Sequence, residues 1–547
     1  MKKFLTTLTA SALALGMIVP MAACGGNFAG ATIALDVDVT QNRPTLSGLF
    51  PAPGMTDSEF NNSGTAKLLE EITGYKVKYS QISGGNEESE VGNALMSQDT
   101  YSFIKCGRGS FDQYVTEDAF LDLTDALKTY GQDLLATIDQ ELWDACTYNG
   151  KIYAIPEYGF GYMQDSAIVF NKKHLAKVGI TKIPETLTEF TDALHALQAE
   201  FGKNDVNYHA LAIAGSDADF SIISSTFEMP CEFYEDENGQ VKNYIYSDAA
   251  DKYFKYMNEE ITQKNCLPKN WDTAQGSQVM TWFTNENISV AQIPYWNFNP
   301  LCGQMAANPK LGYASVEEAR EDLGWATRIK GDGSYGSVVQ EKGRMRGIGD
   351  IGYMIALPVR AVNQAPYALD WMNQKIKDEN YKAFLLGKEG VSHNIIPEAE
   401  KQDGDIGIQE EDGSTTYYRL LPGYKEVEGN SMYTTGGNPK MGRKYWPLRE
   451  ASYDCWPILL PEEEDDLMIL SVLGKCAVLP KWSKVSMQTR SWILTNVQKI
   501  IKASGSSEQT TYSYLLKATQ DNLPKMYLKA DVMSQIQEWY DANRRNH

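Results

Sequence analysis

The sequence predicts an α/β protein divided into two or more lobes. With 547 residues, of which 43% are hydrophobic and 11% aromatic, the chain is too apolar to stay disordered and too long to form one ordinary core. Strand-like and helix-like segments alternate along its first part, which is the pattern of parallel sheets with helical crossovers. Each lobe is therefore expected to contain a sheet flanked by helices.

The first β-α-β unit is predicted near the start of the folded body. Residues 32–39 (TIALDVDV) alternate in polarity like a strand, and residues 65–73 (TAKLLEEIT) have the spacing of an amphipathic helix that Gly74 would cap. Residues 75–82 (YKVKYSQI) are again strand-like, so parallel pairing with a right-handed crossover is expected. Residues 40–64, rich in Pro, Gly, Ser and Asn, are predicted to be a long loop leaving a strand at its carboxyl end, where α/β folds place ligands.

The later elements continue the alternation of strands and helices. They are predicted, in chain order, as a strand at 102–106, helices at 121–130 and 133–143, a short strand within 148–156, a strand at 167–171, helices at 172–178 and 188–201, strands at 287–294 and 348–358, and a helix at 367–386. The Asn149-Gly150 pair is a hairpin turn signal. Residues 399–414, rich in Asp, Glu and Gly, are predicted to form a solvated hairpin or excursion.

The charge of the chain excludes two classes of function. There are 71 acidic and 50 basic residues, and the formal net charge of −21 would repel a nucleic-acid backbone and an anionic lipid surface. Outside the N-terminus, no apolar run is long enough to cross the roughly 30 Å of a bilayer's hydrocarbon core. We therefore expect neither nucleic-acid binding nor a polytopic membrane protein.

The N-terminus predicts export. Lys2 and Lys3 precede an uncharged stretch that runs to Ala23, which is typical of a secretory signal peptide over residues 1–23. Met21 to Cys24, followed by two glycines, resembles the bacterial lipobox, which implies that Cys24 becomes a diacylated N-terminus anchored at the extracytoplasmic face of the cell membrane. An ordinary signal peptide that happens to contain a cysteine is the alternative.

A short tether would separate this anchor from the folded body. Residues 24–31 are small and uncharged, which suits a flexible linker. Because removal of residues 1–23 deletes two lysines and no acids, the exported chain would hold 48 basic and 71 acidic residues and a charge of −23.

The remaining cysteines predict buried thiols. Seven follow Cys24: Cys106, Cys146, Cys231, Cys266, Cys302, Cys455 and Cys476. An odd number cannot all pair within one chain, none is spaced as CxxC, and none stands near a His at the spacing of metal ligands. No cofactor or metal is expected. The acidic run 462–466 is most simply a charged first helical turn, with a calcium site as the less favoured alternative.

Several motifs together resemble one family. They are Gly150, Tyr153 and Pro156 in YNGKIYAIP; Phe170, Asn171 and Lys172; Pro184, Thr186, Glu189 and Phe190; NISVAQIPYWN at 287–297; and GYMIALP at 352–358 with the helical stretch that follows it. In this order and spacing, with the lipobox, they resemble the extracellular solute-binding lipoproteins of bacterial ABC importers. The similarity is to the family 1 sugar-binding type that includes the maltodextrin-binding protein. It runs from about residue 32 to about residue 397, and more weakly to Trp539.

The resemblance implies a two-lobed periplasmic-binding-protein-like fold of type II, in which crossing hinge strands join the lobes. A solute would be held in the cleft between them, and the closed state would be recognised by the permease subunits of the transporter. It implies a first lobe of residues 32–168 plus about 348–400, and a second of about 169–347 plus about 401–547. A monomer without enzymatic activity is expected.

The expected ligand is a carbohydrate, most simply an oligosaccharide. A pyranose ring stacks its C–H face on Trp or Tyr, while carboxylates, amides and guanidinium groups bond its hydroxyls. The resemblance places a stacking residue at Trp296, beside Asn297. Placement after strands or in an aromatic-rich segment adds nine further candidates: Arg108, Phe111, Asp112, Glu157, Tyr158, Gln164, Asp165, Trp446 and Trp456.

Three other functions stay open on the sequence alone. An exported glycoside hydrolase would need two carboxylates roughly 5 to 10 Å apart, and such a pair could exist among 71 acids. However, the chain lacks GxSxG, HExxH and phosphate-loop motifs. The same fold could instead bind a peptide or another small solute. A surface adhesin without a transport partner is the third alternative.

Overall fold

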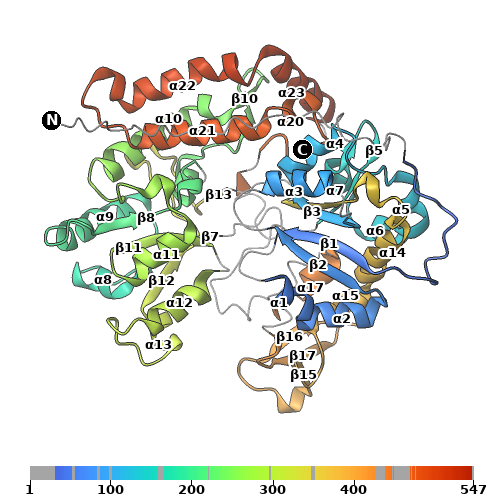
Figure 1. Ribbon diagram of the computed structural model, residues 1–547. Coiled ribbons are helices and arrows are strands. Elements are labelled where there is room, and N and C mark those ends of the chain that lie inside the picture. The colour runs from blue at the N-terminus through green and yellow to red at the C-terminus, as the bar shows by residue number, and fades with distance from the viewer. Residues whose placement is uncertain are drawn as a thin grey trace, which may run out of the picture.

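The computed structural model describes residues 31–51, 56–82, 87–97, 101–157, 166–219, 221–294, 297–346, 352–424, 438–445, 447–448, 468–469, 471–474 and 476–544. Two main sheets with separate cores organise this part of the chain. In Figure 1 the elements of the first sheet lie at the right, mainly in blue, and those of the second at the left, in green. The predicted α/β fold with two lobes is confirmed.

The first sheet has the strand order β2-β1-β3-β14-β6. Its strands are β1 (Leu46–Pro51), β2 (Val77–Ile82), β3 (Phe103–Gly107), β6 (Ala154–Pro156) and β14 (Tyr353–Ala356). Both β2 and β3 pair with β1 in parallel, whereas β14 is antiparallel to β3 and to β6. The start of β14 therefore lies at the edge of the sheet where β3 and β6 end.

Helices cover both faces of the first sheet. They are α1 (Asp57–Asn62), α2 (Gly64–Thr73), α3 (Glu87–Met96), α4 (Arg108–Val115), α5 (Thr124–Tyr130), α6 (Gln132–Thr137), α7 (Gln140–Ala145), α14 (Ala365–Ile376) and α15 (Asp378–Leu386). Trp371 of α14 stacks on Phe103 of β3 with ring centroids 5.0 Å apart. α14 therefore covers the centre of the sheet face to which Phe103 points.

The second sheet has the order β12-β7-β11-β8. Its strands are β7 (Ser166–Asn171), β8 (His209–Ala212), β11 (Ile288–Pro294) and β12 (Leu323–Ala326). β8 runs parallel to β11, and β7 is antiparallel to β11 and to β12. Nearly all residues of these strands are buried, as expected of a sheet covered on both faces.

Helices from the middle and the end of the chain pack around the second sheet. They are α8 (Lys172–Lys177), α9 (Leu187–Phe201), α10 (Asp248–Tyr256), α11 (Gly276–Thr284), α12 (Phe298–Ala307), α13 (Val316–Glu321), α20 (Pro480–Ser483), α21 (Ser486–Ile501), α22 (Tyr512–Met526) and α23 (Ala530–Asn543), with a small hairpin of β9 (Phe233–Glu235) and β10 (Val241–Asn243). Figure 1 shows the C-terminal helices in red along the top, where α21 and α22 pack on α10.

Residues 393–448 contact the first core. The sheet of β15 (His393–Ile396), β17 (Thr415–Leu420) and β16 (Ile406–Gln409), with α17 (Pro439–Lys444), forms a small core that includes Leu386 of α15. Buried Asn438 donates to the carbonyl of Ile376 and to Asp378. The division into lobes stays a prediction. These contacts associate the described residues 406–424, 438–445 and 447–448 with the first core, whereas we expected the second lobe to resume at about 401.

The segment from Cys476 to Met487 contacts both cores. The Val478 amide donates to the Thr147 carbonyl and its side chain packs in the first core, whereas Leu479 and Trp482 belong to the second. Near it, β13 (Met345–Arg346) pairs in parallel with β18 (Met468–Ile469). The two cores are thus joined by contacts near the end of the chain.

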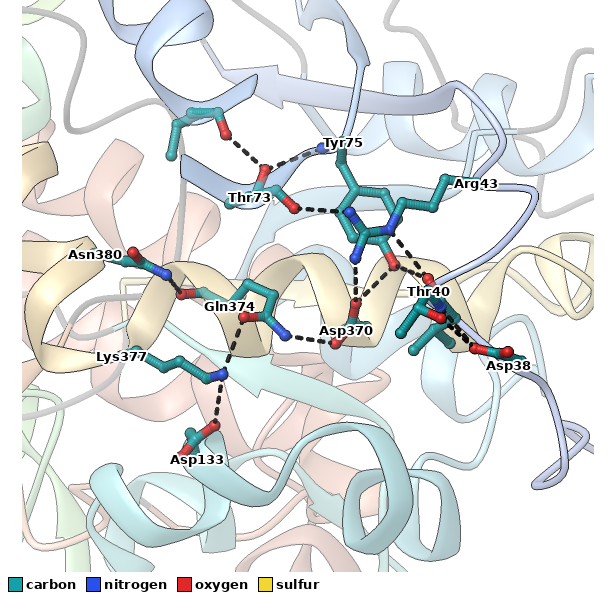
Figure 2. Close-up of polar contacts among 12 residues, drawn as sticks. Asp38, Thr40, Arg43, Thr73, Tyr75, Asp133, Asp370, Gln374, Lys377 and Asn380 are labelled. Atoms are coloured by element: carbon teal, nitrogen blue, oxygen red, sulfur yellow. Dashed lines mark hydrogen bonds and ion pairs between the residues drawn. The ribbon is translucent and has the colours of Figure 1, made fainter. Parts of the chain in front are cut away.

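The predicted strand at 32–39 is wrong. Its apolar residues pack on the first core, but its backbone bonds to side chains: the Val37 amide donates to the Tyr130 hydroxyl, and the Val39 carbonyl accepts from Tyr75. Figure 2 shows how this segment is held on α14, where the Tyr75 hydroxyl donates to Asp370 at 2.7 Å and Arg43 lies 3.9 Å from the same carboxylate.

The true first strand lies inside the stretch predicted as a loop. β1 contains Gly48, where an added Cβ would lie 2.4 Å from the rings of both Phe50 and Phe103. Glycine is uncommon inside strands, which is why the sequence does not predict a strand here. The missing side chain leaves the space that the rings of Phe50 and Phe103 occupy. The β-α-β prediction itself is confirmed, with β1, α2 and β2 as its members and Gly74 as the left-handed cap of α2.

The helix predicted at 367–386 is two helices. Lys377 has an extended ψ of 140° and separates α14 from α15. The carbonyls freed at the break accept from side chains, since Asn380 donates to Gln374 and Asn438 donates to Ile376. The other strands and helices predicted from 102 to 294 are confirmed within a few residues, except that 121–143 forms three short helices. Of the strand predicted at 348–358, β14 covers Tyr353–Ala356, and residues 348–351 lie outside the described part of the chain. The Asn149-Gly150 turn joins β4 (Thr147–Tyr148) to β5 (Lys151–Ile152).

Two further observations concern the described part of the chain. None of its helices has both the length and the apolar character needed to cross a bilayer. Six of the predicted thiols, all except Cys455, lie among the described residues; they are buried, and none of the six is in a disulfide.

Candidate functional site

Five of the predicted ligand-binding residues lie in the described part of the chain: Arg108, Phe111, Asp112, Glu157 and Asn297. The other six, Tyr158, Gln164, Asp165, Trp296, Trp446 and Trp456, lie outside it, as do Cys24 and the acidic run 462–466. The described part of the candidate site consists of the strand ends that precede and follow these residues.

The first-sheet edge, formed by Glu87, Lys105, Gly107, Glu157 and Tyr353, lies where β3 and β6 end and β14 begins. Tyr353 is the register partner of Gly107, and its carbonyl accepts from the Glu157 amide at 3.1 Å. The Lys105 ammonium lies 2.6 Å from the Glu157 carboxylate and 5.2 Å from the centroid of the Tyr353 ring. Burial and the neighbouring Glu87 and Glu157 carboxylates raise the pKa of Tyr353 to about 12.

Glu87 caps the helix that follows β3. Its Oε1 accepts from the Gly107 amide at 2.6 Å and from the Ser110 hydroxyl at 3.0 Å. A carboxylate at this position satisfies a backbone donor at the start of α4 and interacts favourably with the helix dipole.

Lys375 of α14 lies beneath this edge with 1% of its surface exposed. Its ammonium lies 5.3 Å from the centroid of the Trp371 ring. Burial lowers the pKa of Lys375 well below its ordinary value, the Glu157 carboxylate opposes that shift, and the Lys105 ammonium adds to it. The fold therefore disfavours the protonated form of Lys375 beneath this edge.

Arg108 and Asp112 lie at the contact between α4 and the Cys476–Met487 segment. Arg108 Nε lies 2.6 Å from Asp112 Oδ1, and Arg108 Nη2 donates to the Cys476 carbonyl at 2.9 Å. Both side chains are buried. In this structure the pair therefore links the two cores and presents little surface to a solute.

Phe111 is a core residue. None of its surface is exposed, and its ring stacks on Phe120 at a centroid distance of 6.0 Å. Phe111 belongs to the first core, whereas Arg108 and Asp112, one turn apart on α4, pair with each other. We do not retain Phe111 in the proposed site.

The second-sheet edge is formed where β8 and β11 end. Gln292 of β11 accepts from the Ile222 amide at 2.8 Å and donates to Asp217 at 3.3 Å, which fixes the loop that follows β8. Asn297 precedes α12, and its amide nitrogen lies 3.8 Å from where a Cβ on Gly276 would stand, at the start of α11. The starts of α11 and α12 therefore meet at Asn297.

The chain passes from one edge to the other in a few residues. Glu157 follows β6, and Ser166, nine positions later, begins β7 and pairs with Pro294 at the end of β11. The carboxyl ends of β3, β6 and β11 are thus all close to the points where the chain leaves one sheet for the other, which is the usual ligand position in α/β folds.

The sequence missed several residues of these edges. Tyr353 does not follow a strand but begins one, and the antiparallel direction of β14 brings this first residue to the edge where β3 and β6 end. Lys105 and Gln292 lie inside strands, and their polar types within apolar runs were the available signal. Among the described residues, no group of three or more His, Cys, Asp or Glu side chains is placed to share a metal ion.

The chain is similar to a known protein family and to two curated proteins. The model of the family described as "bacterial extracellular solute-binding protein" matches residues 52–389. The diacetylchitobiose binding protein DasA of Streptomyces coelicolor is 25% identical over 194 residues, which cover 33% of this chain and 40% of that protein. A carbohydrate ABC transporter substrate-binding protein of Streptococcus pneumoniae is 27% identical over 176 residues, 31% of this chain and 34% of that protein. These matches span less than half the length of either relative.

A solved structure extends the likeness over almost the whole chain. The N-glycan transport solute binding protein NgtS of Streptococcus pneumoniae, in complex with Man1GlcNAc, superposes with a TM-score of 0.52. The match covers 91% of this chain and 99% of that one at 16% identity. At that identity the likeness shows a shared fold.

Proposed function

The chain belongs to the bacterial extracellular solute-binding proteins, and on this premise we propose that it captures a carbohydrate between its two lobes and delivers it unchanged to the permease of an ABC transporter. The predicted two-lobed fold agrees with the family. Export, and a lipid anchor at Cys24 on the extracytoplasmic face of the membrane, belong to the same proposal, as does a monomeric state.

The observation that carries the proposal is the chemistry of the two strand edges. The first-sheet edge offers the carboxylates of Glu87 and Glu157 beside an aromatic ring, and the second offers the amide of Asn297. Carboxylates and amides bond sugar hydroxyls, and an aromatic ring takes the C–H face of a pyranose. A solute gripped by both edges would stabilise the closed arrangement of the lobes.

An oligosaccharide is the proposed ligand class. One relative is named for diacetylchitobiose and the structural neighbour for N-glycan transport, and both names point to multi-ring sugars. The binding residues we propose are Asn297 and Glu157 from the described edges, together with Tyr158, Gln164, Asp165, Trp296, Trp446 and Trp456. The proposed function requires no bond to be made or broken, so no catalytic residue is assigned.

A thermal-shift panel on the chain without residues 1–23 tests the proposal. The panel contains N,N′-diacetylchitobiose, maltotriose, Man1GlcNAc, digalacturonic acid and trialanine. Binding to the folded state at a hundredfold excess over Kd adds about 2.7 kcal/mol of stability, so a neutral oligosaccharide is expected to raise Tm by several degrees. A rise in Tm with trialanine and with none of the sugars would show that the ligand is a peptide.

Trp296→Ala tests the residue at which the family resemblance places a stacking ring. Its affinity for the panel sugar that binds the wild type should fall about tenfold, as expected for the loss of an aromatic stack together with its buried area. Unchanged affinity in calorimetry would remove Trp296 from the site.

A further inference from the structure

Tyr353 is a partly exposed aromatic residue at the first-sheet edge. Tyr353 retains 37% of its surface exposed, although it begins a strand whose next three residues are fully buried. Tyr514, which is also exposed, lies instead inside the helix α22, which packs on α10 and α21. A partly exposed aromatic residue among charged groups at this edge suits contact with a solute.

We propose that Tyr353 is a sugar-stacking residue and that Glu87 and Glu157 restrict its ligand to a neutral sugar ring. This assignment rests on the proposed function and deepens it, because it names the charge class of the solute and the residues that select it.

Strand register places these groups on one face of the sheet. Residues directly opposite each other on neighbouring strands point to the same side. Gly107 is opposite Tyr353, and a Cβ added to Gly107 would stand 3.2 Å from Glu87 Oε1, so the Glu87 carboxylate occupies the space of the missing side chain. Lys105, two residues before Gly107, points to the same face.

Glu157 completes the set from the other neighbouring strand. The pairing of Met354 with Pro156 brings Glu157 opposite Tyr353, and the Glu157 amide bonds the Tyr353 carbonyl. Glu87 and Glu157 therefore stand on opposite flanks of Tyr353, and the Lys105 ammonium, in contact with Glu157, lies 5.2 Å from the ring centroid.

The charges at this edge favour neutral ligands. Lys105 balances one of the two carboxylates, and the backbone amide that could have received an anion at the start of α4 already bonds Glu87. An acidic sugar stacked on Tyr353 would meet a net negative edge on a strongly acidic molecule. A neutral sugar would place its hydroxyls against carboxylate oxygens, which are strong acceptors.

Calorimetry with the neutral panel sugars and digalacturonic acid tests the assignment. Tyr353→Ala should weaken binding of the neutral sugar about tenfold or more, while Tyr353→Phe, which keeps the ring, should stay within about twofold of wild type. Tyr514→Ala is the matched control, since Tyr514 is 45% exposed on α22, and it should leave affinity unchanged. The Tm of each variant without sugar checks that it is folded.

Glu87→Gln tests the charge. The amide oxygen can still accept from Gly107, but one negative charge is removed, so the affinity for digalacturonic acid relative to the neutral sugar should rise about fivefold. Wild-type affinity in folded Tyr353→Ala, or tighter wild-type binding of digalacturonic acid than of every neutral sugar, would overturn this assignment and leave sugar binding intact. If no panel sugar binds the wild type, the proposed function fails and this assignment fails with it.

Discussion

Lys375 shows how one buried side chain couples the site to stability. Because burial lowers its pKa below the ordinary 10.5, the folded protein binds fewer protons than the unfolded chain in the interval between the two values. The free energy of unfolding of the wild type should therefore rise with pH across that interval and level off above 10.5.

Lys375→Met removes this burial cost while filling a similar volume. The variant should be about 1–3 kcal/mol more stable than wild type at pH 7, since Glu157 keeps its contact with Lys105. The gain should shrink as pH approaches 10. Denaturant unfolding at both pH values measures it, with the exposed Lys499→Met as control. A destabilised Lys375→Met would show that the ammonium contributes more through its partners than it loses by burial.

Single residues also mark the limit of sequence reasoning about the site. The rule that ligands lie after strand ends led to Glu157 and Asn297, which lie at the two described edges and remain predictions. It also selected Phe111, which lies in the first core. It missed Tyr353, whose position depends on β14 running antiparallel to β3. The direction of a return strand is a long-range property that local pattern does not contain.

At the scale of elements, helices with local end signals were predictable. α9 begins with the Thr186–Glu189 capping box, in which each side chain bonds the other's backbone amide. α2 ends at Gly74 with a positive φ of 72°. By contrast, β1 contains a glycine, ends in a proline and is defined by pairing with β2 and β3, so its own residues give little signal.

Thr186→Ala tests the energetic weight of the α9 capping box. Loss of the hydroxyl leaves the Glu189 amide without its acceptor, and we expect a loss of about 1 kcal/mol in the free energy of unfolding. Thr495→Ala, at an exposed position inside α21, is the control and should be neutral or slightly stabilising. If both substitutions change the free energy of unfolding equally in urea titration, the capping box does not stabilise α9.

Gly48→Ala tests whether β1 requires a glycine at this position. The added methyl group would collide with the rings of Phe50 and Phe103, so we expect a destabilisation of about 1–3 kcal/mol. Gly303→Ala in α12 meets no atom within 4 Å and should instead stabilise by up to about 1 kcal/mol. Thermal unfolding of both variants gives the comparison. A tolerated Gly48→Ala would mean that the rings can repack.

At the scale of the whole molecule, the two cores are connected in ways the sequence could not reveal. Length and composition predicted more than one lobe, and the family resemblance supplied the crossing strands. The contact of Arg108 with the Cys476 carbonyl joins residues 368 positions apart. Buried Asn438 bonds the Ile376 carbonyl, 62 positions earlier in the chain. No local pattern encodes either contact.

Closure of the lobes on a sugar should be visible in solution. If both strand edges grip one solute, the radius of gyration from small-angle X-ray scattering should fall when the panel sugar that raises Tm is added, and trialanine should leave it unchanged. A radius that does not change while calorimetry shows binding would mean that a single lobe holds the sugar.

The most direct test of the central claim combines calorimetry with recovery of the sugar. The chain without residues 1–23 is titrated with the neutral oligosaccharide that gives the largest thermal shift, and the bound sugar is then released by heat and weighed by mass spectrometry. We predict one site per chain and a recovered mass equal to the mass added. Shorter products, or binding of peptide without any binding of sugar, would contradict the account.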